Sequence, residues 1–301
     1  MALELRHLRY LLGVAEHGSF TRAAEDLRIS QPTLSHQIKQ LERTVGAQLL
    51  DRSGRTVRLT DAGETYVHHA RRALGDLAAA QRAVQDVADL SRGCLRLALT
   101  PTFTAYLLGP LLADLRTAHP GIAVNVQVMP QERIEAGLLA DDLDLAIAFH
   151  GTHLPGITAT PLFTEHLGLV VAAHTLQAGK REPLPVSDLA TRPLALLSTD
   201  FATRSHIDAY LAAHRVRPHI AVEANSLQAL TELVQRTDLA TVLPDAVTHD
   251  HPLLTPLALT PAMPSRTVAL LRRENAYQSA AAHAFTRLTD TLIRARGYTL
   301  A

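Results

Sequence analysis

The sequence predicts a multidomain protein with a small, mainly helical N-terminal domain, a long coiled-coil helix and a larger α/β domain. Its length of 301 residues exceeds that of one ordinary folding unit, so more than one domain is expected. Apolar residues follow helical spacing up to about residue 90, whereas strand-like and helical runs alternate after it. We therefore place the domains at residues 1–60, 61–92 and 93–301.

The charge balance and the single cysteine exclude several classes of protein. The chain has 29 basic and 29 acidic residues, but residues 27–60 contain six basic and only two acidic residues, a local excess that suits nucleic acid. One cysteine cannot build a disulfide framework or a cysteine-ligated metal site, and no cofactor or metal is expected. The N-terminus does not resemble a signal peptide and no run is apolar enough to span a membrane, so we expect a cytoplasmic protein.

Capping residues and apolar spacing predict three short helices at the N-terminus. Apolar residues recur at helical spacing over residues 5–15, and Ser19 is a suitable N-cap for a second helix. Ser30 caps a third helix, which runs to about Thr44 because Gly46 is placed to end it. The third helix directs its apolar side inward at Leu34, Ile38, Leu41 and Val45.

The opposite side of the third helix carries only small polar and basic groups. In a major groove, Gln and Ser side chains hydrogen-bond base edges, and Lys meets phosphate or guanine. The alternative is an ordinary solvated helix face. The residues that we expect to face DNA on this helix are Ser30, Gln31, Pro32, Thr33, Ser35, His36 and Lys39.

A basic hairpin is predicted directly after the third helix. Residues 48–52 and 55–59 are strand-like, and Ser53-Gly54 between them is a hairpin turn signal. Arg52 and Arg55 flank the turn, where they can contact the DNA backbone or a minor groove. A plain surface turn is the alternative. Together, the three helices and the hairpin predict a winged helix-turn-helix domain that binds double-stranded DNA.

The helix at residues 61–92 has a seven-residue apolar repeat. Such a repeat is typical of a coiled-coil seam, and dimerisation suits a helix-turn-helix because two half-sites double the DNA contacts. The alternative is a linker helix that packs on its own domain. The predicted dimerisation residues are Tyr66, Ala70, Ala73, Leu77, Ala80, Val84 and Val87.

Two segments of the N-terminal domain resemble the LysR-type transcriptional regulators. They read S-F-T-R-A-A-E-D-L, followed by S-Q-P-T-L-S-H-Q-I-K-Q-L-E, at residues 19–27 and 30–42. The run L-L-D-R-S-G-R-T-V-R-L-T-D-A-G at 49–63 is similar to the family as well. Thr33 stands where the family usually has Ala. Within the family, residues 100–104, 223–227 and 270–275 most resemble the branch that regulates the cyanate operon.

The remainder of the chain alternates strands with helices, which predicts a mostly parallel sheet with short connections. The resemblance implies a periplasmic-binding-protein-like domain of two lobes that binds a small-molecule effector in a cleft. The first lobe is expected at 93–161 and 265–301, and the second at 162–264. The longest helices are expected near 102–119 and 276–295.

Effector contacts are expected where strands end and helices begin, because free N–H groups point there. Thr100-Pro101-Thr102 is such a turn and suits a small anion. Simple helix capping is the alternative for the hydroxyl residues, and core packing for the phenylalanines. The candidate effector residues are Thr100, Thr102, Phe103, Gln131, Phe149, Ser198, Phe201, Thr203 and Asn225.

Other sequence features favour no further chemistry. His150-x-x-His153 and other short-spaced histidine pairs are expected in a chain with 16 histidines, and no cysteine or carboxylate completes a metal site. Cys94 has no resolving partner and is interpreted as a buried structural thiol. No catalytic motif is present, so we expect no enzyme. A solute-binding protein would explain only residues 93–301 and would need an export signal.

A DNA-binding transcriptional regulator accounts for all of these features together. The resemblance implies a homodimer or homotetramer that bends operator DNA and responds to a small anion such as cyanate. It also implies activation of the cyanate operon and repression of the regulator's own gene, with RNA polymerase as a further candidate partner. The alternative is a regulator of the same family that responds to another small anion or carboxylate metabolite.

Overall fold

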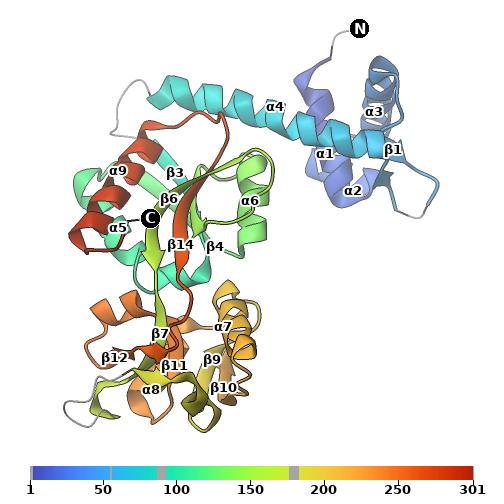
Figure 1. The fold of residues 1–301 in the computed structure, drawn as a ribbon. Coiled ribbons are helices and arrows are strands. Elements are labelled where there is room, and N and C mark those ends of the chain that lie inside the picture. The colour runs from blue at the N-terminus through green and yellow to red at the C-terminus, as the bar shows by residue number, and fades with distance from the viewer. Residues whose placement is uncertain (1–2, 55, 87–92, 176–182, 301) are drawn as a thin grey trace. The chain divides into compact units, whose positions relative to one another are not determined.

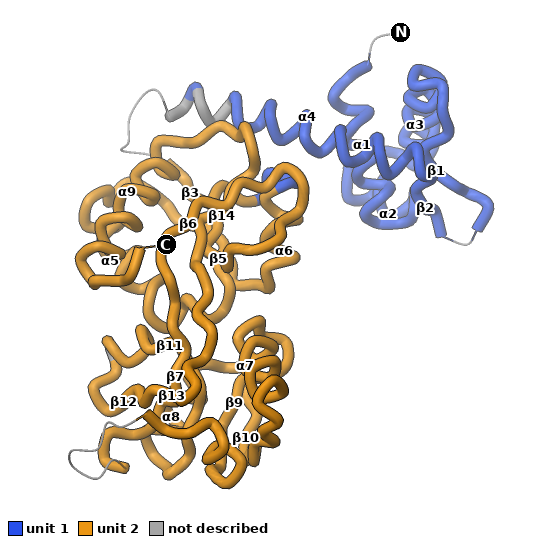
Figure 2. Tube along the Cα trace, in the orientation of Figure 1, with its two compact units in different colours: residues 1–85, 139–142 blue, residues 86–138, 143–301 orange. Residues whose placement is uncertain are grey.

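The computed structural model describes residues 3–54, 56–86, 93–175 and 183–300 (Figure 1). The chain divides into two compact units (Figure 2). The first unit contains residues 1–85 and 139–142, and the second contains residues 86–138 and 143–301. Each unit is described separately below.

The first unit begins with the three expected helices, α1 (Leu5–His17), α2 (Phe20–Asp26) and α3 (Gln31–Val45). The Ser19 and Ser30 hydroxyls accept hydrogen bonds from backbone N–H groups in the first turns of α2 and α3. Gly18 and Gly46 end α1 and α3 in the left-handed conformation that glycine adopts without strain. The helices share one core, whose fully buried members include Leu11, Val14, Ala23, Leu34 and Ile38.

Val45 is the one member of the predicted inward face of α3 that lies outside the core. It is 37% exposed, whereas Leu34, Ile38 and Leu41 are buried. Val45 is the last residue of α3, so the chain has already reached the edge of the core at this point.

The wing is shorter than the sequence pattern predicts. Strands β1 (Leu50–Asp51) and β2 (Arg58–Leu59) pair antiparallel over only two residues each. The predicted hairpin is therefore present, but each of its strands is shorter than the five residues expected on either side of Ser53-Gly54. The physical reason is that the Leu49 and Leu50 N–H groups donate to the Glu42 carboxylate, and the Asp51 carboxylate accepts from Ser53 N–H. These side-chain bonds replace a longer strand ladder.

Helix α4 (Asp61–Asp86) follows the wing and packs on the same core at its N-terminal end. The Thr60 hydroxyl accepts from Gly63 N–H and thereby caps the helix. Gly63 lies so close to the wing that an added Cβ would meet the Leu49 carbonyl oxygen at 2.0 Å. Val67 and Ala70 are buried one and two turns later.

In the second unit, a five-stranded sheet forms the first lobe in the order β4-β3-β5-β14-β6. Its strands are β3 (Gly93–Leu99), β4 (Ile122–Val128), β5 (Leu145–Phe149), β6 (Ile157–Glu165) and β14 (Arg266–Arg273). β3 is parallel to β4 and β5, but β14 is antiparallel to both β5 and β6. The sheet of this lobe is thus mixed rather than mostly parallel, because the chain leaves through β6 and returns through β14.

Helices cover both faces of this sheet. Helices α5 (Leu108–Ala118) and α9 (Ala280–Ala295) lie on one face, and α6 (Gln131–Leu139) lies on the other (Figure 1). Successive residues of the central strands alternate between the two cores, so Leu145 and Ile147 pack with α5 and α9, whereas Ala146 and Ala148 pack with α6. Burial on both faces explains why β5 is entirely apolar.

The helix expected over 102–119 is split in two. A short 3₁₀ helix, η1 (Pro101–Thr104), precedes α5, which begins only at Leu108. Pro110 accounts for the break, because it has no N–H to donate to the carbonyl of Tyr106 and its ring would clash there. Pro110 is tolerated only near the start of a helix, which is where α5 places it.

The second lobe contains α7 (Ala202–Ala213) and α8 (Leu227–Arg236). Its five main strands form two groups, β11-β7-β12 and β10-β9, that an isolated parallel bridge between Leu194 and Ala240 joins. These strands are β7 (Leu167–Ala172), β9 (Pro193–Leu197), β10 (His219–Ala224), β11 (Thr241–Pro244) and β12 (Leu254–Leu257). Short elements complete the lobe: η2 (Ala173–Thr175), β8 (Leu184–Pro185), η3 (Val186–Ala190), η4 (Asp245–Asp250) and β13 (Leu259–Thr260).

One cluster of buried side chains runs through both lobes. It includes Phe103 and Phe149 of the first lobe together with Leu197, Phe201 and Leu230 of the second. The two lobes are therefore packed against each other as well as joined by the chain.

Cys94 is exposed, so the interpretation as a buried thiol is wrong. The residue is second in β3, and its neighbour Gly93 is only half-buried, whereas Leu97, Ala98 and Leu99 further along the strand are fully buried. Among the described residues, no helix is both long enough and apolar enough to cross a membrane.

We predict that Gly63→Ala destabilises the first unit by about 1–3 kcal/mol, because the new methyl group has no room against the Leu49 carbonyl. Gly151→Ala, exposed after β5, is the control, because nothing lies within 4 Å of its added Cβ. The control should change stability by no more than about 0.5 kcal/mol. Urea unfolding followed by circular dichroism measures both effects, and equal stability of the two variants would contradict the close approach.

Candidate nucleic-acid interface and interlobe site

Helix α3 presents a polar face opposite its buried face. All the residues of this helix that were predicted to face DNA are exposed, except Ser35, which is half-buried. The Ser30 hydroxyl caps Thr33 N–H at 3.2 Å and lies 2.7 Å from the Thr33 hydroxyl, so both side chains also hold the helix start. The remaining exposed members of this face are Gln31, Pro32, His36 and Lys39.

Arg52 has partners within its own domain. Its Nη2 donates to Glu42 Oε2 at 2.8 Å, and its guanidinium carbon lies 5.2 Å from the centroid of the Phe20 ring. The Arg52 side chain is 28% exposed and that of Glu42 is 13% exposed. Arg52 thus ties the wing to α2 and α3. Arg55, the other predicted wing residue, lies outside the described residues.

The predicted seam of α4 is buried at one end and exposed at the other. Ala70 is buried and Tyr66 is half-buried against the core of the first unit. Further along, Leu77 is 45% exposed and Val84 is 76% exposed. Ala73 and Ala80 are also exposed, and Val87 lies outside the described residues.

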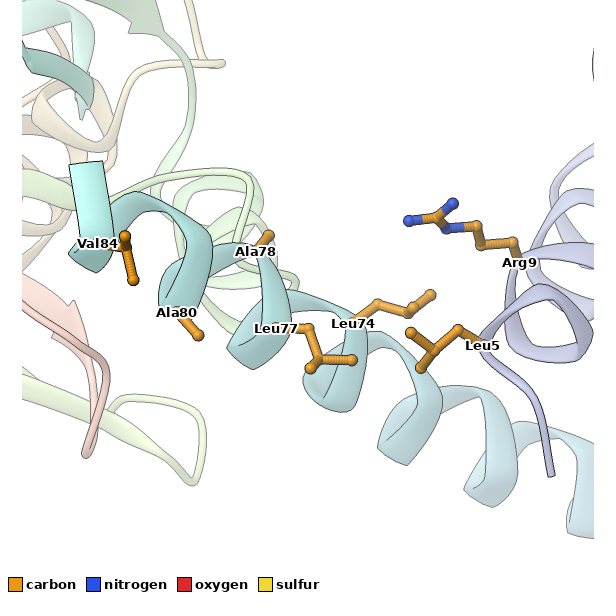
Figure 3. Close-up of a pocket in the computed structure, with 7 residues that line it drawn as sticks. All are labelled: Leu5, Arg9, Leu74, Leu77, Ala78, Ala80 and Val84. Carbon is orange, nitrogen blue, oxygen red and sulfur yellow. The ribbon is translucent and has the colours of Figure 1, made fainter. Parts of the chain in front are cut away.

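A groove of about 760 Å³ runs along this exposed part of α4 (Figure 3). Leu5 and Arg9 of α1 line one side of it. The α4 residues that line it are Leu74, Leu77, Ala78, Ala80 and Val84. Among its described lining residues only Arg9 is charged, and the others are apolar.

In the second unit, two predicted effector residues from opposite lobes are in direct contact. The Thr102 hydroxyl of η1 lies 2.9 Å from the Thr203 hydroxyl of α7, and both residues are buried. Thr100 and Ser198 lie on the turns that lead into η1 and α7. Their hydroxyl oxygens are buried and form no hydrogen bond within the described part of the chain.

The other predicted effector residues have different roles. Gln131 is committed to the backbone of Phe149, because its amide both accepts from the Phe149 N–H and donates to the Phe149 carbonyl, each at 3.1 Å. Phe103 and Phe149 pack with ring centroids 5.0 Å apart, and Phe201 is also buried. Asn225 is exposed at the end of β10.

His153 has a carboxylate partner that the spacing of the histidines did not reveal. His153 Nδ1 lies 2.8 Å from Glu135 Oε1, and Leu154 N–H donates to the second oxygen of Glu135. Burial alone would raise the pKa of Glu135, but the hydrogen bonds from Leu154, His153 and Gln131 lower it. The pair fixes the loop after β5 to α6.

A buried network at the junction of the lobes was missed by the sequence reasoning. The Glu165 side chain is fully buried and pairs with Arg266, whose side chain is 10% exposed. Tyr106 donates to Glu165 Oε1 at 2.6 Å, and Arg266 Nη2 donates to Thr203 at 2.8 Å. Burial and the nearby Glu165 carboxylate raise the pKa of Tyr106 well above its ordinary value, so Tyr106 remains a neutral donor.

The rule that ligands bind between strand ends and helix starts could not locate this network. Glu165 ends β6 and Arg266 begins β14, and neither residue lies in a turn that leads into a helix. A usable signal was present, because both residues lie within a few positions of the lobe boundaries expected at 161/162 and 264/265. Opposite charges near the two points where the chain passes between the lobes indicate such a pair.

Comparison with known proteins agrees with this arrangement. Residues 5–64 match the family model described as "Bacterial regulatory helix-turn-helix protein, lysR family". Residues 88–292 match the "LysR substrate binding domain" model.

Similar full-length proteins are found among characterised sequences and solved structures. The SDS degradation transcriptional activation protein of a Pseudomonas strain is 34% identical over 245 residues, 80% of this chain and 79% of that protein. The probable RuBisCO transcriptional regulator of Trichormus variabilis is 30% identical over 295 residues, 94% of this chain and 86% of that protein.

Among solved structures, full-length OxyR from Pseudomonas aeruginosa superposes with a TM-score of 0.69 at 25% identity, covering 97% of this chain and 95% of that chain. CbnR in complex with its target DNA superposes with a TM-score of 0.61 at 25% identity, covering 96% of this chain and 99% of that chain. Family models match both the N-terminal helix-turn-helix and the two-lobed domain. The chain therefore belongs to the LysR family of DNA-binding transcriptional regulators.

Proposed function

We propose that α3 enters the major groove of operator DNA and reads base edges with Gln31, Thr33 and Ser35, while Lys39 contacts phosphate or guanine. The observation that carries this proposal is the division of α3 into a buried apolar face and an exposed polar face. A helix with one fully polar face can approach base edges without burying an apolar side chain against them. Ser30, Pro32 and His36 complete the proposed DNA-facing surface.

We predict that Gln31→Ala and Ser35→Ala each weaken binding to the operator by about 1–3 kcal/mol while leaving binding to unrelated duplex DNA almost unchanged. Lys39→Ala should weaken binding to every duplex and reduce the slope of log Kd against log salt by about one. His68→Ala, exposed on α4, is the control. Gel shifts at several salt concentrations measure these effects, and wild-type affinity in all three variants would remove α3 from the groove.

Arg52 provides a contrasting case, because its guanidinium is held by Glu42 and Phe20. We propose that Arg52 positions the wing, whereas Arg55 contacts the DNA backbone. Arg52→Gln should therefore reduce affinity on all sequences without changing the salt slope. A slope reduced by about one, as expected for Lys39→Ala, would instead show that Arg52 neutralises a phosphate.

We propose that the exposed seam of the 61–92 helix binds the same helix of a second copy of the chain, and that dimers pair into a homotetramer. The seven-residue repeat continues beyond the part of α4 that its own domain covers, and it leaves Leu77 and Val84 in water. Exposed apolar residues at coiled-coil spacing favour a self-complementary partner with the same repeat. Two copies would then present two DNA-reading helices to two half-sites.

We predict that Leu77→Asp combined with Val84→Asp shifts the protein toward monomer, because two carboxylates per chain would have to be desolvated in the seam. Sedimentation velocity measures the assembly state. Arg71→Asp, exposed on the same helix but not in the seam, is the control. An unchanged oligomer in the double variant would contradict the proposal.

We propose that the effector is a small anion that binds where the lobes meet, near Thr100, Thr102, Ser198 and Thr203. The proposal is supported by the contact between the Thr102 and Thr203 hydroxyls of opposite lobes and by the two buried hydroxyls without a partner on the adjoining turns. Cyanate is the first candidate, because residues 100–104, 223–227 and 270–275 resemble the regulators of the cyanate operon. In that case the protein would activate this operon and repress its own gene.

We predict that sodium cyanate raises the Tm of the second unit relative to sodium chloride at equal ionic strength. A ligand at about 100 times its Kd stabilises the folded state by about 2.7 kcal/mol. Differential scanning calorimetry of the full chain measures the shift. A shift with acetate or bicarbonate but not with cyanate would select the alternative effector class, and no shift with any of the three would contradict a small-anion effector.

A further inference from the structure

The two strands that connect the lobes carry opposite charges at the same level. Glu165 is the last residue of β6 and Arg266 is the first residue of β14, and the two are direct partners in the antiparallel pairing of these strands. Arg266 Nε donates to Glu165 Oε2, and Tyr106 donates to the other carboxylate oxygen at 2.6 Å. The Glu165 carboxylate is thus compensated by one cation and one neutral donor.

Arg266 retains donors that this pairing does not use. Its Nε bonds to Glu165 and its Nη2 bonds to Thr203. Nη1 donates to no group in the part of the chain that the structure describes, and the side chain keeps 10% of its surface exposed. The guanidinium carbon lies 3.8 Å from the centroid of the Phe149 ring, which fixes the plane of the group.

Hydroxyl groups of both lobes follow from Arg266, two of them with partners and two without. Thr203, which accepts from Arg266, lies 2.9 Å from Thr102 of the other lobe. The turns that carry these two threonines also carry Thr100 and Ser198, whose buried hydroxyls have no partner among the described residues. A buried hydroxyl without a hydrogen bond costs about 1–3 kcal/mol, so the site is prepared for a hydrogen-bonding ligand.

We infer that Arg266 is the charge-recognising residue of the effector site and that its Nη1 edge binds the anion through charge-assisted hydrogen bonds. This inference rests on the proposed function of the junction and adds the group that selects for negative charge. Nη1 can only donate, so its partner must be an acceptor, and an ionised acceptor forms the stronger, charge-assisted hydrogen bonds. A carboxylate or a small linear anion matches both the charge and the donors.

The same position explains how binding reaches both lobes. An anion at Nη1 would form a second ion pair with the Arg266 guanidinium, which already pairs with Glu165. Arg266 also holds Thr203 of α7 and, through it, Thr102 of η1. Binding therefore acts on both crossing strands and on the hydrogen bond between the lobes, so that the angle between the lobes becomes sensitive to the ligand.

Calorimetric titration of the full chain with sodium cyanate and with sodium acetate tests this inference. The test variant is Glu165→Gln combined with Arg266→Gln, which removes both charges together and leaves no lone buried charge. The control is Arg96→Gln combined with Asp144→Asn, which removes another partly buried ion pair of the same unit. We expect the Kd of the test variant to rise at least about tenfold, equivalent to about 1.4 kcal/mol, while the control keeps the wild-type Kd.

The outcomes separate this inference from the proposed function. If the wild type and the test variant bind the anion with equal Kd, the role of Arg266 is overturned and the junction remains an effector site. If the wild type binds neither anion, both the role of Arg266 and the small-anion effector are overturned. Melting of each variant by circular dichroism establishes that it is folded, and the single variant Arg266→Lys, which keeps the charge, provides a second folded protein with an expected intermediate Kd.

Discussion

The fully buried carboxylate of Glu165 is the constraint on which the effector domain depends. Removing an ion from water costs several kcal/mol even after relaxation, so a buried carboxylate persists only with a cation and good hydrogen bonds. Arg266 and Tyr106 provide both. Arg266 faces Glu165 at the end of the β6–β14 pairing, and its guanidinium lies over Phe149 and against Thr203. This polar contact joins the lobes beside the apolar cluster that both lobes share.

A second carboxylate organises the DNA-binding unit in a similar way. Glu42 near the end of α3 accepts hydrogen bonds from the N–H groups of Leu49 and Leu50 and from the Arg52 guanidinium. These bonds join α3 to the wing, so the two elements that we propose to contact DNA keep a constant relative position. The net charge of zero for the whole chain does not oppose DNA binding, because the basic excess is local to residues 27–60.

Both carboxylates show how a regulator of this family combines rigidity with response. The bonds of Glu42 are internal to one small unit and leave the exposed side of α3 free for DNA. The bonds of Glu165 instead hold Tyr106 and Arg266 at the edge of the first lobe, and Arg266 in turn donates to Thr203 of the second lobe. In the proposed role of Arg266, a ligand would act at the hydrogen bond between the lobes and leave the bonds of Glu42 in the first unit unchanged.

Local sequence was sufficient for much of the fold. Helix caps at Ser19 and Ser30, the terminating Gly46, and the buried spacing of Leu34, Ile38 and Leu41 predicted α2 and α3 closely, because capping and amphipathic spacing act over a few residues. Short-range patterns also predicted the alternation of strands and helices in the second unit, whereas its two-lobed architecture was implied by the family resemblance. Local sequence also predicted the exposed polar face of α3, because the helical period determines which residues share a face.

Only the tertiary structure decided the partners of charged groups and the course of the strands between lobes. Arg266 and Glu165 are 101 residues apart in sequence, as are Thr102 and Thr203, and no local propensity relates residues at such separations. Arg52 has the sequence context of a DNA contact, yet Glu42 and Phe20 lie within its reach and bind it. Long charged side chains pair with groups that the fold brings close to them. Such pairs persist because an unpaired buried charge is energetically costly.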